Sequence, residues 1–162
     1  MVIMNDKMWN SLDSQKWSSI SSLFPVQTPE KVDCQKAKEF VSNLLCFSDG
    51  VLFLNFHGCQ KYDPITNIDA TGFEGSLNGA HMRDLFAFTP KNAMSCVHQY
   101  IKLIKESSQQ MGVDGKIAFL IGFHEDDEHY DVWVDFHRYR EGEHYLADDL
   151  DGFANKIMII VI

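Results

Sequence analysis

The chain has 162 residues, a formal net charge of −9 and a hydrophobic fraction of 45%, which fit one globular domain and exclude a disordered chain. No apolar run approaches the roughly 20 residues of a membrane span, and the N-terminus lacks the basic and apolar pattern of an export signal. We therefore expect a cytoplasmic protein in which Cys34, Cys46, Cys59 and Cys96, without any CxxC spacing, are reduced thiols.

The first part of the chain is predicted to be helical. Residues 5–24 place apolar side chains near one helical face. A second helix is expected to begin at Thr28 as its N-cap, with an apolar stripe that continues to Leu45. Residues 48–50 (SDG) are a turn signal, and the apolar run 51–57 predicts a strand.

The middle of the chain is less regular. Residues 58–80 hold four of the ten glycines and show no clear periodicity, so we expect a long ordered loop that either flanks a site or is an irregular crossover. A short strand is expected at 82–88. The next helix is expected over 89–112, with Thr89 as its N-cap and Pro90 in its first turn.

The last part of the chain is predicted to form most of a sheet. The run 116–123 is apolar along its length, which is typical of a central strand covered on both faces. The run 130–139 alternates in polarity and is expected to form a hairpin with it. A helical turn near Asp148 and a closing strand at 156–162 follow. The fold class is α+β, a mostly antiparallel sheet with two to three helices packed on one face, in a single domain over 1–162.

The segment 124–151 holds the excess charge of the chain. It contains eleven acidic and two basic residues, a net charge of −9 that equals the charge of the whole chain. In the strand 130–139, one face is expected to carry Tyr130, Val132, Val134 and Phe136, and the other Asp131, Trp133, Asp135, His137 and Tyr139. Two aspartates on one buried face would need partners, so we expect the second face to be at least partly exposed. Aromatic side chains among charges are typical of protein interfaces, although a charged surface with one half-buried tryptophan fits as well.

A metal site and an active site are alternative interpretations of this segment. His124 and His129 match no HExxH or HxH pattern, and Asp131 and Asp135 lie roughly 13 Å apart along a strand, too far to share one ion. The chain has no GxSxG, phosphate-binding loop or dinucleotide fingerprint. We therefore assign no catalytic residue, metal ligand or cofactor. A small hydrolase or metal-dependent enzyme that uses 124–151 is kept as the alternative.

The acidic segment favours a basic macromolecule as the partner, because concentrated negative charge attracts positive surfaces and repels nucleic acid. The segment "HEDDEHYDVWVDFHRYREGEH" in a small acidic α+β chain resembles bacterial toxin-immunity proteins of the contact-dependent growth inhibition or polymorphic toxin type. The resemblance lies in overall character and carries over no residue as a known contact.

The resemblance implies a one-to-one complex with a cognate basic toxin domain, often a nuclease, in the producing cell. Alone, the chain is expected to be a monomer or weak dimer, with no membrane or nucleic-acid partner. From the residues themselves, the predicted partner-binding surface consists of Glu125, Asp126, Asp127, Glu128, Asp131, Trp133, Asp135, His137 and Tyr139.

Overall fold

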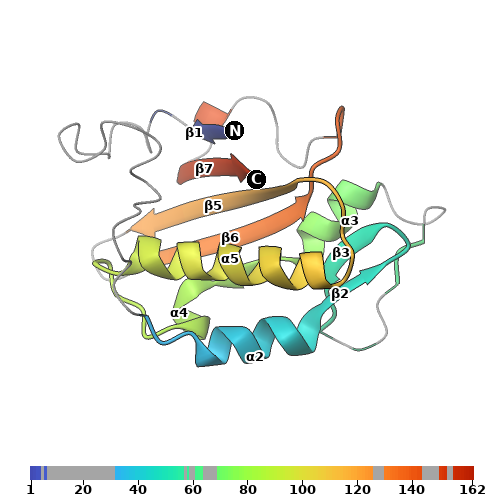
Figure 1. The fold of residues 1–162 in the computed structure, drawn as a ribbon. Helices are drawn as coiled ribbons and strands as arrows, with labels where there is room; N and C mark the ends of the chain where they lie inside the picture. Colours follow the sequence, from blue (N-terminus) through green and yellow to red (C-terminus); the bar gives the residue numbers. More distant parts are fainter. Residues whose placement is uncertain are drawn as a thin grey trace.

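The structure is a computed structural model that describes residues 1–4, 6, 32–56, 58, 61–63, 69–125, 130–143, 150–152 and 155–162. The expected fold class is confirmed: the fold is α+β, with a mostly antiparallel sheet of strand order β1-β7-β5-β6-β4 and a separate hairpin of β2 and β3 (Figure 1). The larger sheet consists of β1 (Val2–Met4), β4 (Ala80–His81), β5 (Ile117–Glu125), β6 (Tyr130–Arg138) and β7 (Lys156–Val161). The hairpin consists of β2 (Leu45–Ser48) and β3 (Val51–Leu54).

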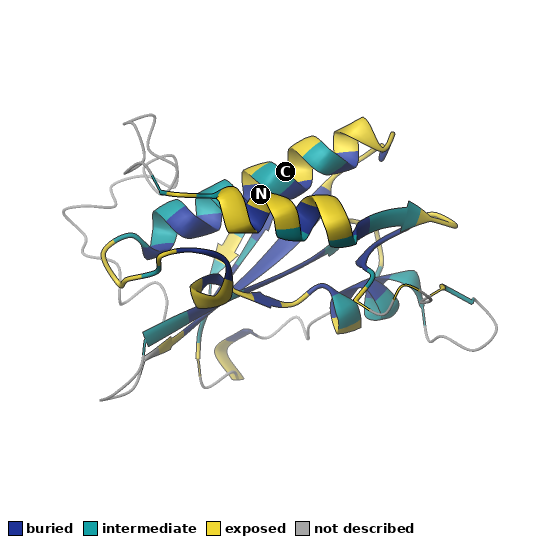
Figure 2. Ribbon diagram, turned by 90° about the horizontal axis from the view of Figure 1, so that it is seen from below, coloured by how far each residue is buried: buried dark blue, intermediate teal, exposed yellow. Residues whose placement is uncertain are grey.

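Helices cover one face of the larger sheet. These are α2 (Gln35–Leu44), α4 (Met82–Leu85) and α5 (Ala93–Gln110). The helix α3 (Ala70–Leu77) packs against β3 and β6, and the 3-10 turn η2 (Leu150–Gly152) lies on the opposite face of the sheet. Figure 2 shows the long helices with one side exposed and the other buried toward the sheet. In the described ranges, no helix is long and apolar enough to cross a bilayer.

The main core lies between these helices and the sheet. Val132, Val134 and Phe136 of β6 point into it, as the alternation predicts, and meet Phe119 of β5 and Tyr100 of α5. The strand β5 is buried on both faces from Ile117 to Phe123, which confirms that it is central.

A second, smaller cluster lies on the opposite face of the sheet. It consists of Leu120, Leu150 and Ile157, with Trp133 and Ile159 packed against it. Because β6 and β7 are both antiparallel to β5, which lies between them, they run parallel to each other and need a connection across one face. Leu150 of η2 places the described part of that connection on the face opposite α5.

Three sequence predictions about the elements are wrong. Residues 82–88 begin with helix α4, not a strand, because Met82 and Leu85 are one helical turn apart and both face the core. The expected loop 58–80 contains α3, whose start is capped by Asp69 accepting a hydrogen bond from Gly72 N. Leu45 is the first residue of β2 rather than the last apolar residue of a helix.

The two expected helix starts have different outcomes. The predicted helix 5–24 and the cap at Thr28 lie outside the described residues, and α2 begins at Gln35. The helix expected from Thr89 begins at Ala93 instead. Thr89 and Asn92 exchange hydrogen bonds between backbone N–H groups and side-chain oxygens, which forms a turn just before the helix.

Candidate functional site

The predicted binding residues of β6 lie on the face of the sheet opposite α5. Asp131, Trp133, Asp135 and His137 alternate with the core residues of the strand, so their shared direction follows from strand geometry. The structure therefore brings these four residues to one face. Their environments differ.

Asp131 is bound by an imidazole and a guanidinium group, those of His81 in β4 and Arg83 in α4. Its Oδ2 lies 2.6 Å from His81 Nδ1, and its Oδ1 forms an ion pair with Arg83 Nε at 3.1 Å. Its Oδ1 also accepts from Val132 N at 2.8 Å. The carboxylate is 13% exposed, whereas His81 and Arg83 are 55% and 41% exposed. Asp131 is thus a shielded carboxylate held mainly by exposed partners.

Trp133 lies against two glycines, one on each side of β6. A Cβ atom on Gly122 of β5 would be 2.8 Å from Trp133 Cε3, and one on Gly79, next to β4, would be 2.9 Å from Trp133 Nε1. The indole therefore extends across the strands over two positions that have no side chain. It is partly buried and packs against the cluster around Leu150.

Asp135 contradicts the expectation that this face is open. It is only 2% exposed, and its Oδ1 accepts a hydrogen bond from Phe136 N at 2.6 Å. Burial raises the pKa of Asp135 from 3.8 to about 7, although the hydrogen bond from Phe136 opposes the shift. A carboxyl group in this environment cannot contact a partner directly, and we remove Asp135 from the predicted surface.

Of the remaining predicted residues, His137 is near the C-terminal end of β6 and Tyr139 directly follows the strand. His137 is partly buried, its Nδ1 donates to Arg138 O at 2.9 Å, and burial lowers its pKa. Tyr139 is 41% exposed and stays available for a partner. Glu125 is the last residue of β5, and Asp126, Asp127 and Glu128 lie outside the described residues.

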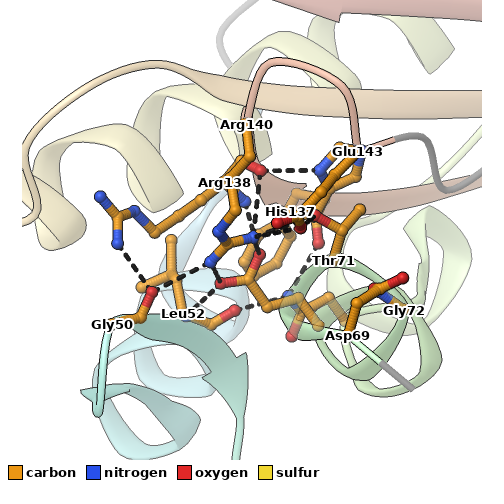
Figure 3. Close-up of polar contacts among 12 residues, drawn as sticks. Gly50, Leu52, Asp69, Thr71, Gly72, His137, Arg138, Arg140 and Glu143 are labelled. Carbon is orange, nitrogen blue, oxygen red and sulfur yellow. Dashed lines mark hydrogen bonds and ion pairs between the residues drawn. The ribbon is translucent and has the colours of Figure 1, made fainter. Parts of the chain in front are cut away.

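Figure 3 shows Arg138 and Arg140, the two basic residues of the acidic segment, in an internal network with Gly50 and Leu52. The carboxylate at its centre is that of Glu74. Glu74 is fully buried, and its two oxygens accept from Arg140 Nη2 at 2.8 Å and Nη1 at 2.9 Å. They also accept from Leu52 N and Arg138 N, both at 2.7 Å. Burial opposes ionisation of Arg140, but the hydrogen bonds and charge of Glu74 outweigh it and raise the pKa of Arg140. Four donors at one carboxylate make this a complete buried ion pair.

Asn78, four residues after Glu74, also links β3 to β6. Its Oδ1 accepts from Leu54 N at 2.8 Å, and its Nδ2 donates to Leu52 O at 2.8 Å and Phe136 O at 2.7 Å. Glu74 and Asn78 of α3 thus satisfy backbone groups on the edges of β3 and β6. Two side chains here take the place of a strand that would otherwise join the two sheets.

Arg138 and Arg140 also fix the turn between β2 and β3. Both guanidinium groups donate to Gly50 O, at 2.7 Å and 3.0 Å. Asp49 and Gly50 have φ angles of 53° and 77°, so this two-residue turn uses left-handed backbone that Gly accepts readily. Arg138 donates in addition to Asp114 O, and it lies 5.4 Å from the ring centre of Phe47. Both bases of the acidic segment are therefore engaged within the fold.

Sequence reasoning missed His81, Arg83, Glu74 and Asn78. His81 and Arg83 are about fifty residues from Asp131 in the sequence, and no local pattern connects them. Glu74 and Asn78 are four residues apart, which is a helical spacing, but the glycines around them lower the helix propensity of this stretch. Within the described residues, no three His, Cys, Asp or Glu side chains are grouped to hold a metal ion.

Comparison with known protein families gives a match over nearly the whole chain. The model of the family described as "Uncharacterized protein PM0498 family" matches residues 3–162. The comparisons with curated proteins and with solved structures find no match.

Proposed function

The chain belongs to the uncharacterized PM0498 family, and we propose that it is a cytoplasmic immunity protein that binds and neutralises a cognate basic toxin domain. The toxin domain is envisaged as a nuclease, because a nuclease needs a positive cleft to hold phosphates. An acidic protein that occupies this cleft, or covers a face beside it, would block the substrate.

The observation that best supports this proposal is that both arginines of the acidic segment bind groups within the fold. Arg140 is paired with the buried Glu74, and Arg138 is bound to the carbonyl groups of Gly50 and Asp114. Among the described residues, Arg140 Nη1 also lies 4.0 Å from Oε2 of Glu143, at the outer limit of an ion pair, so both guanidinium groups are held mainly by groups other than the acidic side chains of 124–151. The fold therefore leaves the negative charge of this segment largely uncompensated by its own bases, and a basic partner would supply the missing charge.

The surface proposed for binding is narrower than the sequence predicts. It keeps Asp131, Trp133 and Tyr139, together with the charges of residues 125–128. Asp135 is buried and His137 is partly buried, so neither is counted as a contact. A substitution at either position would affect binding by changing the stability of the strand that carries the surface. His81 and Arg83 border this surface as the exposed partners of Asp131 and are not counted among its contacts.

One contact favours the enzyme alternative. Asp131 holds Nδ1 of the exposed His81 at 2.6 Å, and a carboxylate in this position fixes the imidazole so that Nε2 can accept a proton. A small hydrolase would use His81 as a general base. His81→Gln should abolish any hydrolytic activity of the chain while it changes partner binding only modestly.

The test is co-expression with a candidate toxin domain, taken from a large protein encoded next to the gene where such an open reading frame exists. The chain should rescue growth of a host that produces this domain, and the two should elute as a one-to-one complex. The purified chain should inhibit the nuclease or other activity of the domain in stoichiometric amounts. Growth arrest unaffected by the chain, with no complex at micromolar concentration, would contradict the proposal.

A further inference from the structure

We propose that Trp133 and Asp131 form a recognition point for one arginine side chain of the partner, and that Arg83 of the chain occupies this point until the partner binds. This inference rests on the proposed binding function and specifies the chemistry of the partner. The recognition point consists of the fixed indole of Trp133 and the shielded carboxylate of Asp131. The guanidinium of Arg83 is the group that the partner's arginine would displace.

The aromatic surface is fixed by the two glycines. The six-membered ring of Trp133 lies over Gly122, and its pyrrole ring lies beside Gly79. A Cβ atom at either position would approach the indole to within 3.0 Å, so the sequence leaves room for the ring only because both residues are glycine. A planar cation can stack on a ring held in this way without the entropic cost of ordering it.

The carboxylate lies two residues before Trp133 on the same face of β6. Asp131 already forms an ion pair with the guanidinium of Arg83, whose Nε lies 3.1 Å from Oδ1, which shows that its position suits this group. Arg83 also donates to Tyr130 O at 3.2 Å. Its side chain is 41% exposed, so the guanidinium end of the pair is already in contact with water and loses little when it leaves Asp131. Exchange of Arg83 for an arginine of the partner would therefore meet little resistance.

Arginine fits this arrangement better than lysine does. A guanidinium group is planar, stacks on aromatic rings and can donate to Oδ1 of Asp131 while His81 holds Oδ2, whereas an ammonium group is a strongly hydrated point charge. The chain provides an internal example of guanidinium and aromatic ring in contact, since Arg138 lies 5.4 Å from the ring centre of Phe47. The excess of negative charge in 124–151 would draw such a basic segment toward the face.

The test is a titration of the ¹⁵N-labelled chain with a blocked tri-arginine peptide and, separately, a blocked tri-lysine peptide at equal ionic strength. The signal is the indole Nε1–H resonance of Trp133, which is assigned by its loss in Trp133→Phe, because Trp9 and Trp17 give two further indole signals. We expect saturable binding of the arginine peptide, about fivefold tighter than that of the lysine peptide.

Three variants separate the recognition point from general charge attraction. Asp131→Asn should weaken the arginine peptide about fivefold, and Arg83→Gln should tighten it, because the internal competitor is gone. Asp114→Asn removes the same charge at an exposed position and should change the affinity much less. No movement of the Trp133 resonance, or equal affinity for the two peptides, would overturn the inference. The inference would also be overturned if Asp114→Asn lost as much affinity for the arginine peptide as Asp131→Asn does.

The same variants distinguish this inference from the proposed function when they are assayed with the toxin domain. If the domain binds the wild-type chain but Asp131→Asn and Arg83→Gln leave its Kd unchanged, the recognition point is wrong and the binding function stands. If the domain does not bind at all while the peptide results hold, the proposed function fails and the recognition point is supported.

Discussion

Glu74 is the residue on which the joining of the two sheets depends most. Its carboxylate is fully buried and accepts hydrogen bonds from two backbone N–H groups and from both terminal nitrogens of Arg140. A glutamine side chain would place an NH₂ group against some of these donors and leave Arg140 without its counter-charge. Glu74→Gln should therefore lower the free energy of unfolding by about 3–5 kcal/mol, as the loss of one partner of a buried ion pair does.

Urea denaturation measures this loss, and Glu106→Gln is the matched control. Glu106 pairs with Lys102 at 3.8 Å on the exposed side of α5, and its replacement should cost about 0.5 kcal/mol or less. Similar stability losses in the two variants would mean that the Glu74 network contributes no more than a surface pair.

Asp135 gives the molecule a stability that depends on pH. Its pKa is raised from 3.8 to about 7, so between these values the folded protein keeps a proton that the unfolded chain releases. The free energy of unfolding therefore falls as the pH rises from about 4 to about 7, and the full cost of the buried charge is present above that range. At about 1.36 kcal/mol per pH unit, this cost is up to roughly 4 kcal/mol.

Asp135→Asn should remove this dependence. The amide oxygen can still accept the hydrogen bond from Phe136 N, and the buried group no longer has a charge to lose or gain. At pH 8 the variant should be more stable than the wild type, and at pH 4 the two should be nearly equal. Urea denaturation at a series of pH values tests this, with the exposed Asp114→Asn as control; parallel curves for wild type and Asp135→Asn would contradict it.

At the scale of elements, the strands were predictable and their connections were not. The runs 116–123 and 130–139 have unambiguous apolar and alternating patterns, and β5 and β6 follow them closely. The helix α3 was missed because two of its eight residues are glycines, which weaken the local helical signal. Contacts with β3 and β6 through Glu74 and Asn78 stabilise it, and such tertiary contacts leave no periodicity in the sequence.

The candidate site was predictable to a similar extent. Alternation along β6 placed Asp131, Trp133 and Asp135 on one face, because a strand fixes the direction of every second side chain. It could not show that Asp135 is buried or that His81 and Arg83 bind Asp131. Those features depend on which strand lies beside β6, and strand order is set by long-range packing rather than by local pattern.

The second face of the sheet gives a prediction about packing between strands. Gly122→Ala would place a Cβ atom 2.8 Å from Trp133 Cε3 and displace the indole from β5. We expect a loss of about 1–3 kcal/mol in unfolding free energy, as overpacking causes, together with a shifted Trp133 indole resonance. Gly152→Ala is the control, because no atom lies within 4 Å of the added Cβ; equal stability of the two variants would show that the indole is loosely held.

At the scale of the whole molecule, charge is distributed unevenly. The segment 124–151 carries a net charge equal to that of the entire chain, and the rest of the sequence is balanced. In the part of the segment that the structure describes, folding neutralises this excess only in part, because Arg140 is paired chiefly with Glu74, which lies outside the segment, while Asp131 is paired with Arg83. A field of one sign acts over about a Debye length, so it accelerates encounter with a basic partner before any contact is formed.

This distribution predicts how association with the toxin domain depends on salt. The association rate measured by stopped flow should fall as ionic strength rises, because exposed charges are screened. Replacing Asp126, Asp127 and Glu128 with Asn, Asn and Gln should slow association and flatten the salt dependence, with little effect on dissociation. Asp131→Asn should instead act mainly on dissociation, because this carboxylate is shielded from water and would contact the partner directly. An association rate that is indifferent both to salt and to the triple substitution would remove electrostatic docking as the role of the acidic segment, and would favour the His81 and Asp131 pair as its functional feature.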